Sequence, residues 1–216
     1  MTAEVNAPAP KAPAPQDHRA DPRPLYARTS ARLAELIAAV PRERMVAPTP
    51  CEEFDVRALI AHLVEGMHGV ALVAEGGTKG AAVSAAPADD GDAAAWAAEY
   101  EKASALALAA WEDDAKLDAP MTVPWGTVPG RAALAGFVME NVTHIWDLAQ
   151  ALDTEIGLDP GPGEFALAVA RLAVGEERRG EGVPFGPVRE VPEGADVYGQ
   201  LAAWLGRRTD WAARNR

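Results

Sequence analysis

Apolar residues recur at helical spacing along most of this 216-residue chain, and this periodicity constrains its fold more than any other feature. In the first stretch, residues 24–40, Leu33, Leu36, Ile37 and Val40 stand at i, i+3, i+4 and i+7, on one face of a helix. Similar patterns extend over residues 56–73, 93–113, 130–152, 163–173 and 197–205. Ala and Leu, which favour helices, are abundant, whereas aromatic residues make up only 6% of the chain. The sequence therefore predicts an all-α protein.

Three segments interrupt this pattern. Residues 1–22 alternate Ala and Pro and hold almost no large apolar side chains, so they cannot bury enough surface to offset the entropy of ordering. We expect a disordered tail there, followed by a single domain over residues 23–216. Residues 76–92 are rich in Gly, Ala and Asp and predict an exposed loop. Residues 117–128 predict a short extended, hairpin-like segment.

Charge and cysteine content narrow the function classes. The formal net charge of -12 repels phosphate backbones and anionic lipid, so nucleic-acid and membrane-surface binding are not expected. The single cysteine, Cys51, excludes an intramolecular disulfide and a cysteine-rich zinc site. We see no apolar run of about 20 residues for a membrane helix and no secretory signal, so we expect a cytoplasmic protein that acts on small molecules.

The most informative polar residues lie in the stretch over 130–152. Glu140 and His144 are four residues apart, so they project side by side from a helix, and Asp147 lies one turn further along. A third metal ligand must come from another helix. The candidate is His62, whose apolar neighbours in the second stretch leave it in need of a polar partner. On spacing alone, a surface salt bridge and a hydrogen-bonded core histidine remain alternatives.

Two motifs indicate a family. The segment TPCEEFDVRALIAHL, residues 49–63, resembles the opening motif of the DinB/YfiT-like superfamily, and ENVTHIWDL, residues 140–148, is similar to its second motif. The similarity is greatest to the actinobacterial branch with the N-terminal domain of mycothiol-dependent maleylpyruvate isomerase and its short metal-binding relatives. PFGP and WLGRRTDW, residues 184–187 and 204–211, resemble the end of those short relatives. The resemblance covers about residues 25–211.

This resemblance implies a four-helix up-down-down-up bundle, with the hairpin-like segment and extra C-terminal helices added to it. It also implies a divalent metal bound by His62, Glu140 and His144, with Asp147 orienting a ligand histidine. Phe54 stands where the family usually has Trp. The chain also lacks the separate C-terminal domain of the isomerase itself, which puts that particular activity in doubt.

Such a site has three chemical interpretations. Two imidazoles and one carboxylate around zinc, nickel or iron leave an open position at which a thiol loses its proton. The leading hypothesis is therefore a metal-dependent transferase or isomerase that uses mycothiol or a similar thiol as cosubstrate. The same ligands also form the triad of non-haem iron oxygenases. A non-catalytic metal-bearing binding or resistance protein is the third alternative. A homodimer is compatible with the pattern, which does not require one.

Other residues have weaker signals. His68 is six residues from His62, on the far side of the helix, and we expect no ligand role for it. Cys51 stands beside two glutamates that oppose its ionisation, which favours a structural role. Met121, Trp125 and Trp146 line a pocket over the metal in one interpretation and are simply core in the other. Arg57 and Arg131 are candidates for a substrate carboxylate, although salt bridges are their commoner use.

Overall fold

The computed structural model describes residues 21–77, 87, 89, 92–176, 179 and 185–211. The elements follow in the order α1 (Arg23–Ala38), η1 (Arg42–Arg44, a 3-10 turn), α2 (Val56–Ala74), α3 (Ala93–Ala110), α4 (Ala115–Asp118), β1 (Pro120–Val123), β2 (Gly126–Pro129), α5 (Gly130–Leu152), α6 (Pro160–Ala173) and α7 (Val197–Trp204). The expected tail lies outside the described residues except for its last two, and most of the loop expected over 76–92 also lies outside them.

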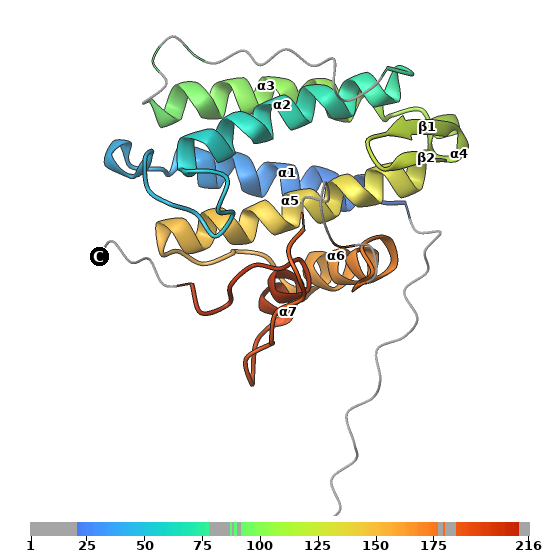
Figure 1. Ribbon diagram of the computed structural model, residues 1–216. Helices are drawn as coiled ribbons and strands as arrows, with labels where there is room; N and C mark the ends of the chain where they lie inside the picture. Colours follow the sequence, from blue (N-terminus) through green and yellow to red (C-terminus); the bar gives the residue numbers. More distant parts are fainter. Residues whose placement is uncertain are drawn as a thin grey trace, which may run out of the picture.

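Four long helices, α1, α2, α3 and α5, form the bundle (Figure 1). Helices α1 and α5 run in one direction and α2 and α3 in the other, which is the up-down-down-up arrangement that the resemblance implies. Contacts at the helix ends agree with these directions. Arg23 at the start of α1 bonds the carbonyl oxygens that follow α3, and Arg44 beyond α1 bonds the carbonyl of Ala151 near the end of α5. The prediction of an all-α bundle is confirmed.

Aspartate residues begin four of the helices. Asp55, Asp92, Asp159 and Asp196 each accept a hydrogen bond from a backbone N–H in the first turn of α2, α3, α6 and α7, at 2.7–3.0 Å. Such caps satisfy donors that have no partner within the helix. The prediction that α6 begins at Gly163 was wrong by three residues. Asp159 caps the helix before Pro160, and proline fits the first helical position because it has no N–H to satisfy.

The segment between α3 and α5 contains the expected hairpin and one element that the sequence pattern did not reveal. Strands β1 and β2 pair antiparallel, with Met121 opposite Val128, and the hairpin lies at the end of the bundle where α5 begins (Figure 1). The four-residue helix α4 precedes it. The C-terminal helices α6 and α7 pack on α5 and on each other, outside the four main helices.

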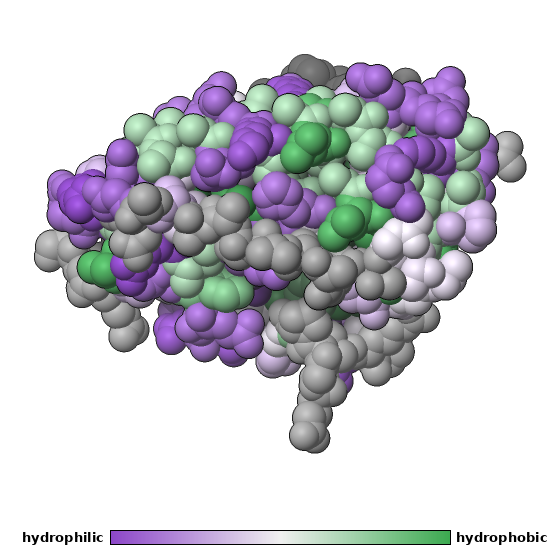
Figure 2. Space-filling model, turned by 90° about the horizontal axis from the view of Figure 1, so that it is seen from above, coloured by the Kyte–Doolittle hydropathy of each residue, from purple (hydrophilic) through white to green (hydrophobic). Residues whose placement is uncertain are grey.

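The core runs through the bundle and the C-terminal helices, from Tyr26 to Leu205. By length and hydropathy alone, one helix among the described residues, α2, is long and apolar enough to cross a membrane. Half of that stretch is buried inside the bundle, and a core helix passes the same test. The face that carries α2 and α3 mixes hydrophilic with hydrophobic residues (Figure 2).

Candidate metal centre

The loop before α2 positions the first histidine of the site. The Thr49 hydroxyl donates to the carbonyl oxygen of Phe54 at 2.8 Å, and Asp55 then caps α2. This closed loop places the Phe54 ring against the ring of His62, with 5.0 Å between ring centroids and 25° between planes. The aromatic residue that departs from the family motif therefore packs directly on the candidate ligand.

Helix α5 supplies the other two candidate ligands. Glu140 and His144 project towards His62, whose Nε2 lies 3.3 Å from Glu140 Oε1 and whose ring centroid lies 5.2 Å from that of His144. One ligand atom from each of the three residues falls within 4.8 Å of the other two. His144 is nearly buried, whereas the side chains of His62 and Glu140 are 32% and 26% exposed. The group is therefore closed by the core on one side and open to solvent on the other.

This donor set fits a metal ion. Bonds of about 2.0–2.1 Å in a tetrahedral zinc site place ligand atoms about 3.4 Å apart. The contact between His62 and Glu140 is already close to that length, and no separation in the group exceeds it by more than about 1.4 Å. Small rotations of partly exposed side chains cover such a difference. The three residues would supply three of the four ligands of a tetrahedral site.

Asp147 lies behind His144 and fixes its ring. Its Oδ2 is 3.0 Å from His144 Nδ1, and it is fully buried. Burial raises the pKa of the Asp147 carboxyl, but the bond to His144 and the charge of Arg207 outweigh it and hold the pKa below its usual value. Burial also lowers the pKa of His144. A neutral imidazole that donates from Nδ1 to a carboxylate keeps the Nε2 lone pair for a metal ion.

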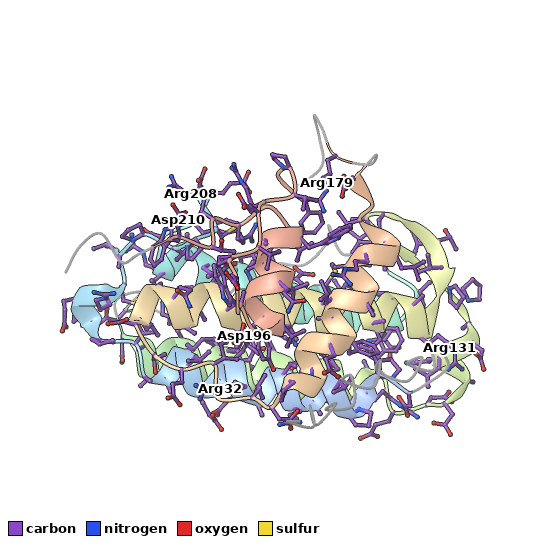
Figure 3. All side chains as sticks on the ribbon, turned by 90° about the horizontal axis from the view of Figure 1, so that it is seen from below. Arg32, Arg131, Arg179, Asp196, Arg208 and Asp210 are labelled. Carbon is purple, nitrogen blue, oxygen red and sulfur yellow. The ribbon has the colours of Figure 1, made fainter. Side chains whose placement is uncertain are left out.

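Arg207 is the residue of this cluster that sequence reasoning missed. Its Nε donates to Asp147 Oδ1 and its Nη2 to Asp147 Oδ2, each at 3.1 Å, across 60 positions of the chain. The segment WLGRRTDW was noted only as a family resemblance, but a buried carboxylate on α5 requires a cation, and that requirement is the signal that could have led to Arg207. The next residue, Arg208, pairs instead with Asp210 (Figure 3).

The remaining candidates lie apart from the group. Cys51 is buried, and burial raises the pKa of its thiol to about 11, which agrees with a structural role. Arg131 pairs with Asp118 at 2.6 Å, at the hairpin end of the bundle (Figure 3). Met121 and Trp146 belong to the core, whereas Trp125 is 51% exposed. Among the described residues, one group of His, Cys, Asp and Glu side chains lies close enough to share a metal ion, and it contains neither His68 nor Cys51.

Comparisons with known proteins agree with this geometry. The family model of the mycothiol maleylpyruvate isomerase N-terminal domain matches residues 26–149, which include all three candidate ligands. Two uncharacterised proteins of Mycobacterium tuberculosis, from strains CDC 1551 and H37Rv, are each 34% identical over 188 residues, covering 87% of this chain and 98% of theirs. No solved structure matches significantly. The chain therefore belongs to the mycothiol maleylpyruvate isomerase N-terminal domain family, within the DinB/YfiT-like superfamily, which implies a mycothiol-related, metal-associated function.

Proposed function

We propose that His62, Glu140 and His144 bind one divalent metal ion, with zinc as the first choice and nickel or iron as alternatives. At this site the protein activates a low-molecular-weight thiol, such as mycothiol, for transfer to a small electrophile or for thiol-assisted isomerisation. The observation that carries the proposal is the convergence of three ligand atoms from two helices at a face that is open to solvent.

The residues in and around the proposed site have distinct roles. His144 presents Nε2 because Asp147 holds Nδ1, and Arg207 holds Asp147 in its ionised form. The stacked ring of Phe54 restricts the rotation of His62. A divalent ion bound here would lower the pKa of a thiol that reaches its open position. Two neutral imidazoles and one carboxylate leave a net charge of about +1 at the ion, which favours an anionic thiolate as the next partner.

The donor set also supports a second candidate. Two histidines and a carboxylate with open positions are the ligands of non-haem iron oxygenases. Oxygen uptake that requires both Fe(II) and a thiol would select this function over thiol transfer. We further propose that the protein acts in the cytoplasm and that its substrate is a small molecule. Its net charge of -12 opposes binding to nucleic acid.

A conjugation assay tests the leading proposal. The full chain, loaded with one metal at a time, is incubated with mycothiol and a panel of electrophiles, and conjugates are counted by mass spectrometry. His62→Ala should lower turnover at least about 100-fold, because it removes a ligand. His68→Ala is the matched control, the same change on the same helix outside the group, and should leave turnover unchanged. Loaded protein that forms no conjugate with any electrophile would overturn the thiol proposal.

A further inference from the structure

A groove lies between the loop that precedes α2 and the C-terminal part of the chain. Its volume is about 600 Å³, within the range of sites for small molecules. The loop contributes residues 50–53 to its lining, and the C-terminal part contributes Arg179, Arg189 and residues 185–187 and 206–208. Two of these residues, Arg179 and Arg208, lie on the same edge of the molecule (Figure 3). The groove is therefore large enough for an organic ligand, and none of the candidate metal ligands lines it.

Two glycine residues bring the segments on the C-terminal side of the groove into contact. Gly206 has a φ of +87°, and a Cβ added there would lie 2.7 Å from Cα of Gly186. Any other residue at this position would therefore strain the backbone and collide with the neighbouring segment. Arg179 donates to the carbonyl oxygen of Gly186, and Nε of Arg189 donates to that of Gly206 at 3.4 Å. This contact thus places two guanidinium groups on neighbouring backbone carbonyls.

The arginine residues of the groove differ in how their charges are balanced. Arg207 and Arg208 each have an aspartate partner. Within the described part of the chain, Arg179 and Arg189 form no ion pair, and their side chains bond only carbonyl oxygens. Nε of Arg179 is buried without a hydrogen-bond partner, and burial lowers the pKa of this guanidinium. Neutral carbonyls hold the two cations in place but do not balance their charge, so a bound anion would be stabilised there.

The rest of the lining restricts the kind of anion. Pro50, Phe185 and Pro187 provide apolar surface, which favours a ligand with an organic body. Glu52 and Glu53 are exposed on the loop side of the groove and would repel additional negative charge. A single carboxylate can accept hydrogen bonds from guanidinium groups through both of its oxygens. The lining therefore suits a monoanion with an apolar body better than a phosphate dianion.

We propose that this groove binds a small organic monocarboxylate, with its carboxylate at Arg179 and Arg189 and its apolar body beside Phe185. The site is separate from the candidate metal centre. Arg207 lines the groove and bonds Asp147, and Asp147 in turn bonds Nδ1 of His144, the ring nitrogen that does not face the metal group. The two sites are therefore linked through this chain of contacts and share no ligand-binding atom. Binding in the groove requires neither a metal ion nor the proposed thiol chemistry.

The test uses benzoate, titrated into the zinc-loaded full chain and followed by the backbone amide cross-peaks of Gly186 and Gly206. Wild type should show saturable shifts of both peaks. Arg189→Gln should raise the Kd at least about fivefold, because it removes one of the two proposed carboxylate partners from an exposed position. Arg179→Gln should raise the Kd at least as much. Arg28→Gln removes the same charge from an exposed pair on α1, outside the groove, and should leave the Kd within about twofold of wild type.

Glu53→Gln separates the charge argument from folding. The loss of this carboxylate should lower the Kd for benzoate about two- to threefold, a gain that misfolding cannot produce. Benzamide, which has the same shape without the charge, should bind at least about tenfold more weakly than benzoate. Benzamide that binds as tightly as benzoate, or benzoate shifts that ignore both Arg179 and Arg189, would overturn the inference.

Two further measurements identify the ligand class and the site. Inorganic phosphate should bind more weakly than benzoate, and tighter binding of phosphate would contradict the assignment to a monocarboxylate. His62→Ala should leave the Kd for benzoate unchanged, whereas loss of binding in this variant would place the probe at the metal group and overturn the inference. A protein that takes up no metal but still binds benzoate through Arg179 and Arg189 would overturn the proposed function and support the groove as a separate site.

Discussion

Two consecutive residues of α5 lie in polar clusters of opposite character. Asn141 faces α1, where its side-chain nitrogen donates to Thr29 Oγ1 at 3.2 Å and to Ser30 Oγ at 3.1 Å, and all three residues are buried. Glu140 faces α2, where it meets His62 at a partly exposed seam. The two directions differ by about 100° around the helix axis. The first cluster pairs an amide donor with hydroxyl oxygens, whereas the second brings imidazole nitrogens and a carboxylate close together.

This contrast separates a structural cluster from a candidate site. The Asn141 cluster satisfies its groups with protein partners, as buried polar residues usually do. The group of His62, Glu140 and His144 converges between α2 and α5, which pack less extensively than the pairs α2 with α3, α1 with α5 and α1 with α3, and the group has an open side. We therefore expect substitutions of α5 residues that face α1 to lower stability, and substitutions of residues at the contact between α2 and α5 to weaken metal binding.

The largest effect should come from Asp147→Ala, because the buried Asp147 contacts both the candidate ligand His144 and Arg207. The change leaves Arg207 buried without its counter-charge and should lower the free energy of unfolding by about 3–5 kcal/mol. Metal affinity should also fall about 10- to 100-fold as the His144 ring loses its anchor. Urea unfolding and metal titration measure the two effects. The double change Asp147→Leu with Arg207→Leu should recover most of the stability, and a loss below about 1 kcal/mol in the single variant would show that Asp147 is not coupled to Arg207.

His62→Ala should separate binding from stability most cleanly. Metal affinity should fall at least about 100-fold, because one of three ligands is lost. The stability of the metal-free protein should change by less than about 1.5 kcal/mol, since His62 is partly exposed and loses mainly its stacking on Phe54. Competition with a chromophoric chelator gives the affinity, and His68→Ala serves as the matched control. Equal metal affinities in His62→Ala and His68→Ala would show that His62 is not a ligand.

Asn141→Ala should show the opposite behaviour. The free energy of unfolding should fall by about 1–3 kcal/mol, because the hydroxyl groups of Thr29 and Ser30 lose a buried donor. Metal affinity should stay within about twofold of wild type, because no ligand moves. Thermal unfolding and metal titration on the same sample check both statements. A large loss of metal with little loss of stability would place Asn141 in the metal site instead.

The smallest effect is expected at Cys51. Burial raises the pKa of its thiol to about 11, so the thiolate fraction at pH 8 is about one in a thousand and rises about tenfold per pH unit up to that pKa. Alkylation by iodoacetamide should follow this rise between pH 8 and 10. Cys51→Ser should leave metal content unchanged. Alkylation that is already fast and pH-independent at pH 8 would identify a reactive thiol and contradict a structural role.

The helices and the α5 part of the site could be predicted from the sequence, because both depend on spacing within one helix. Glu140, His144 and Asp147 share a stripe by periodicity alone. His62 has no spacing relation to them. Its apolar neighbours made it a candidate, and the family resemblance favoured a ligand role over a hydrogen-bonded core histidine. Arg207 could not be predicted, because it reaches Asp147 from another part of the chain through tertiary packing. The start of α6 was predicted three residues too late, because the apolar spacing does not extend to Pro160 at the first helical position.

Metal content of Glu140→Ala and Asn141→Ala, beside wild type, tests the central claim most directly. Each protein is purified, reconstituted with zinc, desalted and analysed by elemental mass spectrometry. We expect about one equivalent in wild type and in Asn141→Ala, and less than about a tenth of an equivalent in Glu140→Ala. Wild type that stays metal-free after reconstitution with zinc, nickel and iron, or Glu140→Ala that retains a full equivalent, would contradict the claim that the α2–α5 seam is a metal site.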